Sequence, residues 1–180
     1  MVELRHELPA GVEQVADAAE VQAAVGRLAA GLQPFVDTED CVLLTVMLGG
    51  MIPAAWVAGR LTGDYELDYC HLTRYRGHET GGRLQWRQKP GAKLAGRTVL
   101  VVDDIYDEGI TLEYLRNECL RLGAARVVTA VLVAKDHGRD AGRRRPDFIG
   151  LIVPDRYVFG AGMDYRHRWR HLPEILALAD

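Results

Sequence analysis

A strand, a helix and a second strand follow one another between residues 98 and 134, and this order constrains the fold more than any other feature of the sequence. Residues 98–102 form a continuous apolar run that predicts a buried strand. Residues 111–122 carry apolar side chains at helical spacing and are followed by Gly123, a good C-terminal cap. A second apolar run covers residues 126–134. Two strands joined by a helix in this way lie parallel in one sheet.

The same alternation of strands and helices precedes and follows this unit. It predicts a helix over 18–32, which Asp17 can cap and which ends before Pro34. It also predicts a strand over 42–47, a helix over 51–61, and strands over 65–72 and 148–153. Two such units in series predict an α/β protein with a mostly parallel sheet and helices on both faces. At 180 residues we expect a single domain over 1–180.

One uncharged stretch, from Cys41 to Gly59, approaches the length of a membrane span. Gly49-Gly50 and Pro53 interrupt it, so we interpret it as a buried strand followed by a buried helix. The three cysteines are widely spaced, which argues against a disulfide framework or a zinc site. The first residues lack a signal-like apolar segment, and the net charge is −3. We therefore expect a cytoplasmic protein without a membrane anchor and without general affinity for nucleic acid.

The carboxyl end of the strand over 98–102 carries the most informative residues. Ligands of open α/β sheets bind at this edge, and here Asp103 and Asp104 follow the apolar run. Ionised carboxylates accept hydrogen bonds, so the pair suits ribose hydroxyls or the water shell of Mg²⁺. The next turn contains Asp107 and Gly109 and leads to Thr111. Its N–H groups and the helix N-terminus suit a phosphate, so one turn could hold both ends of a phosphorylated sugar.

Two other interpretations of these acids explain less. Asp103 and Asp104 could merely end a strand, with Asp107 as a helix cap, but three acids, a glycine and a threonine are packed into this one turn. A paired-aspartate phosphoacceptor, as in response regulators, has its acidic pair near the N-terminus and its acceptor on a later strand. This chain lacks that order.

The stretch from Val99 to Thr111 resembles the phosphoribosyl-diphosphate-binding motif of type I phosphoribosyltransferases, which runs four apolar residues, two acids, two variable residues, Asp, one more, Gly, one more, Thr. Lys135, the block from Pro146 to Tyr165, and Arg170-His171-Leu172-Pro173 narrow the resemblance to the hypoxanthine-guanine, or 6-oxopurine, branch. The similarity covers about residues 18–178. It implies a Mg²⁺-dependent enzyme of purine salvage that transfers a 5-phosphoribosyl group from phosphoribosyl diphosphate to purine N9 and releases pyrophosphate.

The resemblance implies a role for each acid of the motif. Asp107 matches the catalytic general base, which hydrogen-bonds purine N7. Asp103 and Asp104 match the acids that bind the ribose hydroxyls and the Mg²⁺ shell, and Asp164 matches an acid that helps to hold a second Mg²⁺. Asp107, Gly109, Ile110 and Thr111 would complete the phosphoribosyl-diphosphate site.

Other matched residues would bind the base and the pyrophosphate. Lys135 matches the lysine that binds the purine 6-oxygen, and an ammonium group disfavours the 6-amino group of adenine. Tyr157 would stack on the base while backbone groups of Val158 read its edge. Arg170 matches a pyrophosphate-binding arginine. Leu48 and Gly49 match a pyrophosphate loop, in which the resemblance implies a cis peptide between Met47 and Leu48.

Two segments match mobile or covering parts of the family's site. The polar, glycine-rich segment 73–92 matches a flexible active-site loop that closes over the sugar. A β-hairpin turning at Gly81-Gly82 is the alternative interpretation of this segment. Residues 154–180 match a small C-terminal hood.

The sequence departs from the family pattern at four places. Leu48 replaces a common lysine, Arg74 replaces a serine before Tyr75, and Asp103 replaces a glutamate. Glu108 stands where the phosphate turn usually carries a hydroxyl, and an acid beside a phosphate could cost about 4 kcal/mol. We therefore predict that the Glu108 side chain points to solvent.

The sequence leaves other functions open. A regulator that kept the fold, senses phosphoribosyl diphosphate or nucleotide and binds nucleic acid would use Arg143-Arg144-Arg145 and the cluster over 166–170, but the net charge of −3 disfavours it. An enzyme that prefers xanthine or a pyrimidine is a further alternative. The resemblance also implies a homodimer or homotetramer.

Overall fold

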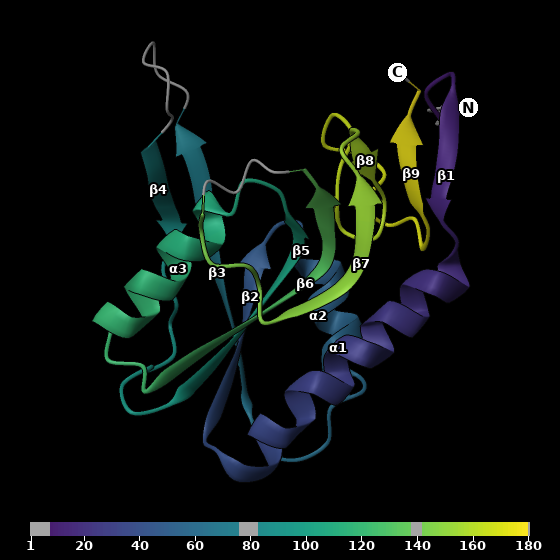
Figure 1. The fold of residues 1–180 in the computed structure, drawn as a ribbon. Helices are drawn as coiled ribbons and strands as arrows, with labels where there is room; N and C mark the ends of the chain where they lie inside the picture. Colours follow the sequence, from purple (N-terminus) through teal and green to yellow (C-terminus); the bar gives the residue numbers. More distant parts are fainter. Residues whose placement is uncertain (1–7, 76–82, 138–141, 180) are drawn as a thin grey trace, which may run out of the picture.

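The central element of this computed structural model is a six-stranded sheet in the order β4-β3-β2-β5-β6-β7 (Figure 1). The structure describes residues 8–75, 83–137 and 142–179. The five strands β3, β2, β5, β6 and β7 are parallel to one another, and the edge strand β4 pairs antiparallel with β3. Their bounds are β2 Cys41–Met47, β3 Glu66–Tyr75, β4 Arg83–Gln88, β5 Thr98–Tyr106, β6 Arg126–Asp136 and β7 Phe148–Pro154.

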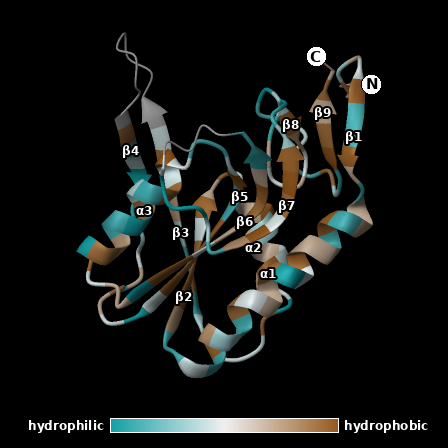
Figure 2. Ribbon diagram, viewed as in Figure 1, coloured by the Kyte–Doolittle hydropathy of each residue, from teal (hydrophilic) through white to brown (hydrophobic). Residues whose placement is uncertain are grey.

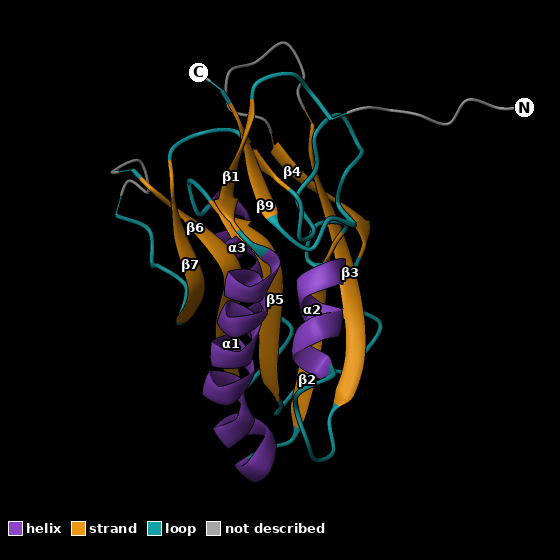
Figure 3. Cartoon of the chain, turned by 90° about the vertical axis from the view of Figure 1, so that its right-hand side faces the viewer, coloured by secondary structure: helices purple, strands orange, loops and turns teal. Residues whose placement is uncertain are grey.

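Helices cover both faces of this sheet, as the sequence predicts. α1 (Ala18–Thr38) and α2 (Met51–Ala58) pack on one face, where Leu28, Val57 and Leu100 belong to one buried cluster (Figure 3). α3 (Ile110–Arg121) packs on the other face, in a second cluster around Leu115. The central strands β2, β5 and β6 are mostly apolar (Figure 2) and buried, which is the expected pattern for a sheet covered on both sides.

The first helix corrects the sequence prediction. It was expected to end at residue 32, but α1 runs to Thr38 with Pro34 inside it. Proline removes one helical hydrogen bond, yet the last turn buries Val36 and sets the Phe35 ring edge-on against Phe148 at 6.4 Å. This packing outweighs the local preference of proline to end the helix.

The strands on either side of α3 also differ from the prediction at their ends. β5 was expected to stop at residue 102 but continues to Tyr106, because its parallel pairing with β6 extends to Tyr106 and Ala134. β6 was expected to stop at residue 134 but continues to Asp136, because its pairing with β7 extends to Asp136 and Pro154. Asp103 and Asp104 therefore lie within the last part of a strand. α2 ends at Ala58, before the residue 61 that was expected. The stretch from Cys41 to Gly59 is a strand and a helix, as interpreted above.

A second, three-stranded sheet in the order β1-β9-β8 stands beside the end of β7. It consists of β1 (Val12–Ala16), β8 (Val158–Phe159) and β9 (Ile175–Leu178). We call this sheet and residues 154–179 the hood. The sequence placed the hood in 154–180 alone and missed β1, which pairs with β9 and brings the N-terminal part of the chain into it.

The polar segment 73–92 contains regular structure at both of its ends. Residues 73–75 belong to β3, and β4 pairs with them in an antiparallel register, Thr73 with Gln85 and Arg74 with Leu84. This pairing agrees with the hairpin interpretation. The expected turn at Gly81-Gly82 lies outside the described residues, and closure of the segment over the sugar stays a prediction.

Two observations on the described residues concern a possible membrane span and the state of the cysteines. No helix among them is both long enough and apolar enough to cross a bilayer. Cys41, Cys70 and Cys119 are buried free thiols, and burial raises the pKa of Cys41 and of Cys119 to about 11. Such thiols pack as small apolar side chains rather than as nucleophiles.

Candidate active site

The candidate site lies at the carboxyl ends of β2 and β5, where the strand order of the parallel sheet reverses. Ligands of open α/β sheets bind at this position. β2 is followed by a cis peptide between Met47 and Leu48, which agrees with the expectation, and then by Gly49. A Cβ atom on Gly49 would lie 1.8 Å from Asp104 Oδ2, so the two segments touch. Only glycine allows this close approach.

Asp103 and Asp104 form a pair of buried acids at the end of β5. Their side chains are turned back on the chain, because Asp103 Oδ1 accepts the Asp104 N–H at 2.9 Å and Asp104 Oδ1 accepts the Ile105 N–H at 2.8 Å. Burial raises the pKa of both carboxyls, and the charge of Asp104 raises that of Asp103 further. Two neighbouring carboxylates with little access to water favour a cationic partner.

The turn after β5 encloses a small cavity of about 140 Å³. It is lined by residues 105–112, including Asp107, Gly109, Ile110 and Thr111. Gly109 has φ +79° at the start of α3, and a Cβ there would come within 2.7 Å of the Tyr106 ring. The cavity thus lies directly at the N-terminus of α3, where backbone N–H groups and the helix dipole favour an anion.

Asp107 and Lys135 meet at a neighbouring cavity of about 200 Å³. Its lining also contains Asp104, Ile105, Tyr157, Val158, Met163 and Asp164. Lys135, near the end of β6, places Nζ 3.4 Å from Asp107 Oδ2. Burial alone would raise the pKa of Asp107, but the Lys135 charge and hydrogen bonds from His137 and Lys135 outweigh it and hold the pKa of this carboxyl below its usual range.

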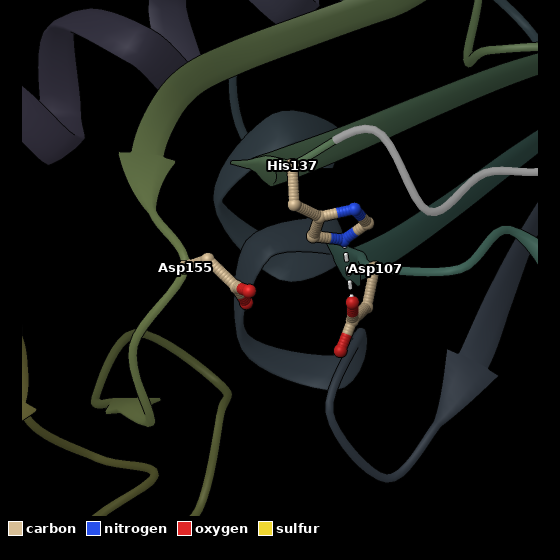
Figure 4. Close-up of side chains that lie close together, drawn as sticks. All are labelled: Asp107, His137 and Asp155. Carbon is tan, nitrogen blue, oxygen red and sulfur yellow. Dashed lines mark hydrogen bonds and ion pairs between the residues drawn. The ribbon is translucent and has the colours of Figure 1, made fainter.

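Two residues that contact Asp107 or Lys135 were not found from the sequence. His137 Nε2 lies 2.6 Å from Asp107 Oδ1 (Figure 4). Asp155 Oδ1 lies 3.6 Å from Lys135 Nζ. Both follow the carboxyl end of a parallel strand, β6 for His137 and β7 for Asp155. A search for polar residues just beyond every predicted strand end would have found them.

The hood supplies the remaining predicted residues. Arg170 Nη2 contacts Asp164 Oδ1 at 2.5 Å, and its Nη1 lies 4.0 Å from Asp104 Oδ2. Tyr157 is half-exposed, and its hydroxyl donates to the Asp164 backbone oxygen at 3.0 Å. Val158 is buried in β8 and lines the larger of these two cavities. The hood therefore faces the strand ends across that cavity.

The predicted site residues thus come together from four parts of the chain. Asp103, Asp104 and Asp107 come from β5 and its turn, Lys135 from β6, and Tyr157, Val158, Asp164 and Arg170 from the hood. The Leu48 side chain is half-exposed after β2. Glu108 lines the small cavity and is partly buried, so its orientation toward solvent stays a prediction.

A nucleic-acid-binding regulator would use the run Arg143-Arg144-Arg145. Two of these three arginines have acidic partners. Arg143 Nε lies 3.2 Å from Glu113, and Arg144 Nη2 lies 2.7 Å from Asp147. In the cluster over 166–170, Arg170 is bound to Asp164. Charges paired within the chain are less available to phosphates, so the nucleic-acid alternative gains no support here.

Comparison with known proteins identifies similar chains. Residues 11–168 match the phosphoribosyl transferase domain family. The hypoxanthine-guanine-xanthine phosphoribosyltransferase of Tritrichomonas foetus is 31% identical over 87% of this chain and 85% of its own. The hypoxanthine-guanine phosphoribosyltransferase of Bacillus subtilis is 32% identical over 87% of both chains. A solved hypoxanthine-guanine-xanthine phosphoribosyltransferase structure superposes with a TM-score of 0.84 at 28% identity, covering 94% of this chain and 99% of that one.

Proposed function

This chain belongs to the phosphoribosyltransferase family, in its hypoxanthine-guanine branch, and on that basis we propose that it transfers the 5-phosphoribosyl group of phosphoribosyl diphosphate to N9 of a 6-oxopurine. Pyrophosphate is the other product. The reaction is one of purine salvage, because it converts a free base directly into a nucleotide. Xanthine is included among the candidate bases, since the Tritrichomonas foetus relative carries xanthine in its name.

The observation that carries this proposal is the pairing of an acid and an ammonium group at one cavity. Asp107 and Lys135 both line the cavity of about 200 Å³ and lie 3.4 Å apart. An ionised carboxylate accepts the N–H of a purine ring nitrogen, and an ammonium group donates to a 6-oxygen. Adenine offers an amino group at that position, so Lys135 disfavours it. Tyr157, half-exposed on the hood, supplies a ring face for stacking.

The sugar phosphate fits the smaller cavity beside it. The 5′-phosphate would bind the N–H groups of the turn and the Thr111 hydroxyl at the N-terminus of α3. Asp107 lines both cavities, so the purine and the sugar meet at this residue. Arg170, 4.0 Å from Asp104, and the backbone at Leu48 and Gly49 would bind the pyrophosphate.

The acids of the site suit magnesium. Asp103 is buried and the neighbouring Asp104 nearly so, and the absence of a side chain at Gly49 leaves room for the Asp104 carboxylate. Hard oxygen donors of this kind are the ligands that Mg²⁺ takes, usually one or two carboxylates together with substrate phosphates. Asp103 and Asp104 would hold one ion and Asp164 would help to hold a second, and bound Mg²⁺ would neutralise charge on the departing pyrophosphate.

Asp107 accepts the proton that the purine loses in this reaction, and Lys135 orients the ring. As N9 bonds to the sugar carbon and the bond from that carbon to pyrophosphate breaks, the purine loses the proton of its other imidazole nitrogen, N7. Asp107 takes this proton, which is why the low pKa of the carboxyl matters: it keeps the base ionised before the reaction. Lys135 holds the 6-oxygen, so the ring is oriented with N9 toward the sugar.

Pyrophosphate release tests this function directly. The protein is mixed with phosphoribosyl diphosphate and Mg²⁺, and hypoxanthine, guanine, xanthine, adenine and uracil are compared. We expect turnover with one or more of the 6-oxopurines and little with adenine. Turnover with adenine as fast as with the 6-oxopurines would contradict the role of Lys135, and turnover with uracil alone would contradict the purine assignment. If no base is turned over while phosphoribosyl diphosphate still binds, the protein is a sensor of that ligand rather than an enzyme. A salt-dependent mobility shift with nucleic acid would then be sought.

A further inference from the structure

His137 is a buried imidazole that contacts the proposed base directly. It follows β6, its side chain is 7% exposed, and its Nε2 lies 2.6 Å from Asp107 Oδ1 (Figure 4). The low pKa of Asp107 keeps that carboxyl ionised near neutral pH, and an ionised carboxylate only accepts hydrogen bonds. His137 therefore carries a hydrogen on Nε2 and donates it to Asp107.

The two oxygens of Asp107 have different neighbours. His137 holds Oδ1, whereas Lys135 faces Oδ2 from 3.4 Å and also faces Asp155 Oδ1 from 3.6 Å. Under the proposed function Lys135 turns to the purine 6-oxygen when the base binds. His137 lines neither of the two cavities, so the base does not compete for it. Its hydrogen bond can persist while the other side of the carboxylate receives the purine.

A metal ion is the competing explanation of this cluster. Ligand atoms of Asp107, His137 and Asp155 lie within 4.8 Å of one another, as a metal site would require. The Lys135 ammonium, however, lies within 3.6 Å of both carboxylates. A cation at the centre of the cluster would meet this positive charge at close range, and the ammonium already neutralises the acids.

We propose that His137 is a positioning residue of the phosphoribosyl transfer, which fixes the Asp107 carboxylate through Oδ1 so that Oδ2 faces the purine N–H. This inference rests on the proposed function. His137 does not touch the substrates, and no proton passes to it. A carboxylate held from one side keeps its reactive oxygen in line with the proton it accepts, and a misplacement of about 1 Å can cost a hundredfold in rate.

The hydrogen bond from His137 also affects the pH range in which the Asp107 carboxyl is ionised and can accept a proton. Among the residues that the structure describes, the charged and titratable groups near Asp107 include Lys135 of β6, His137 just after β6, and Asp155 in the segment after β7. The His137 hydrogen bond is one of the causes that lower the pKa of Asp107. Its loss raises that pKa, so the acid limb of the kcat profile moves to higher pH.

Three variants test the inference on the full-length protein. His137→Ala removes the donor, His137→Gln replaces it by an amide N–H that reaches a similar position, and His171→Gln is the matched control at an exposed histidine of the hood. For each, kcat and the KM of hypoxanthine and of phosphoribosyl diphosphate are measured across about pH 3 to 8, a range that includes the acid limb of a carboxylate base. Thermal melts report whether each variant is folded.

We expect His137→Ala to lower kcat by about tenfold to a hundredfold, to shift the acid limb upward and to leave the KM of phosphoribosyl diphosphate unchanged. His137→Gln should recover most of the loss and the position of the limb. A wild-type kcat and an unmoved limb in folded His137→Ala would overturn the inference alone, as would a His137→Gln variant no better than His137→Ala. If the wild type turns over no base, the proposed function fails and this role fails with it.

Discussion

The Asp107 carboxylate is held in its charged form by neighbours that a substrate can partly replace. Lys135 faces one oxygen and His137 the other, and together they lower its pKa against the opposing effect of burial. A general base needs this property, because a protonated acid cannot take a proton from the purine. The proposed role of the residue therefore depends on two side chains that lie beyond the motif.

Asp107→Asn removes the base while conserving size. We expect kcat for hypoxanthine to fall by about a hundredfold or more, with a much smaller change in the affinity for phosphoribosyl diphosphate, because the backbone N–H groups of the turn stay in place. Steady-state kinetics and calorimetric titration measure the two effects. Asp64→Asn, at an exposed position in the loop before β3, is the control and should keep kcat near the wild-type value. Equal activity of Asp107→Asn and wild type would refute the assignment.

Gly49→Ala tests the close approach of the segment after β2 to β5. The added methyl group would lie 1.8 Å from Asp104 Oδ2, so the carboxylate has to move. We expect affinity for Mg²⁺ with phosphoribosyl diphosphate to fall at least tenfold, since overpacking costs about 1–3 kcal/mol. Gly26→Ala in α1 is the control, because nothing lies within 4 Å of its new Cβ. Unchanged affinity in Gly49→Ala would show that the site does not need this contact.

The residues of the site were predictable to different degrees. Asp103, Asp104, Asp107 and Thr111 stand in one short motif, so their spacing alone indicates a common ligand. Lys135 and Arg170 were found only through the resemblance, because a lone cation at a strand end has no distinguishing pattern. His137 was missed for a physical reason: its partner Asp107 is thirty residues earlier, and only the parallel pairing of β5 with β6 brings them together.

At the scale of elements, Asp147 joins three parts of the fold. Its Oδ2 accepts from the Thr129 N–H at 2.8 Å and from Arg116 of α3 at 2.9 Å, and its Oδ1 accepts from Arg144 at 2.7 Å. Partial burial alone would raise the pKa of Asp147, but these hydrogen bonds lower it to about 2. The carboxylate thus fixes the entry of β7 to β6 and α3.

Asp147→Asn should therefore lower stability in a pH-dependent way. Because the folded pKa is below the unfolded one, the stabilisation is fully present above about pH 5 and is lost as the pH falls toward 2. We expect a loss of about 1–2 kcal/mol at neutral pH, reduced from the full shift because the side chain is partly exposed. Urea unfolding at several pH values measures it. Asp64→Asn, at an exposed loop position, is the control, and a pH-independent difference would contradict the argument.

Elements were predictable where the pattern was long. The strands β2, β5 and β6 are continuous apolar runs, and α3 has a clear apolar face and a glycine after it. The strands β1, β8 and β9 are short, and their hydrogen-bond partners are far apart in sequence, so no local pattern indicates them. Pro34 misled the prediction of α1 because the packing of Phe35 and Val36 is a tertiary effect.

At the scale of the whole molecule, the hood connects the beginning of the chain to the proposed purine site. Val158 pairs with Ala177 of β9, and Ala177 pairs with Glu13 of β1. Arg156 adds an ion pair to Glu13 at 2.5 Å. A residue that lines the larger cavity is thus supported by a strand that is more than 140 positions earlier in the sequence.

Removal of residues 1–16, which keeps the Asp17 cap of α1, should loosen the hood. We expect the KM of the purine to rise several-fold more than that of phosphoribosyl diphosphate, because Tyr157 and Val158 lie on the hood while the phosphate turn lies on β5 and α3. Initial-rate kinetics with each substrate varied separately measure the two constants. A deletion of residues 1–7, which leaves β1 whole, is the control. An equal rise of both constants would indicate general unfolding instead.

The pairing of β1 with β9 also determines where a label can be attached without disturbing the site. Val12 lies opposite Leu178, and the Ala179 N–H donates to the Gly11 oxygen at 2.8 Å, so the described ends of the chain lie side by side (Figure 1). For an affinity tag or a fluorophore, these two described ends are one attachment point, and it borders the sheet that supports Tyr157. The loop before β3, around Asp64, lies at the opposite, amino-terminal edge of the parallel strands. A label that must leave the catalytic face clear belongs there.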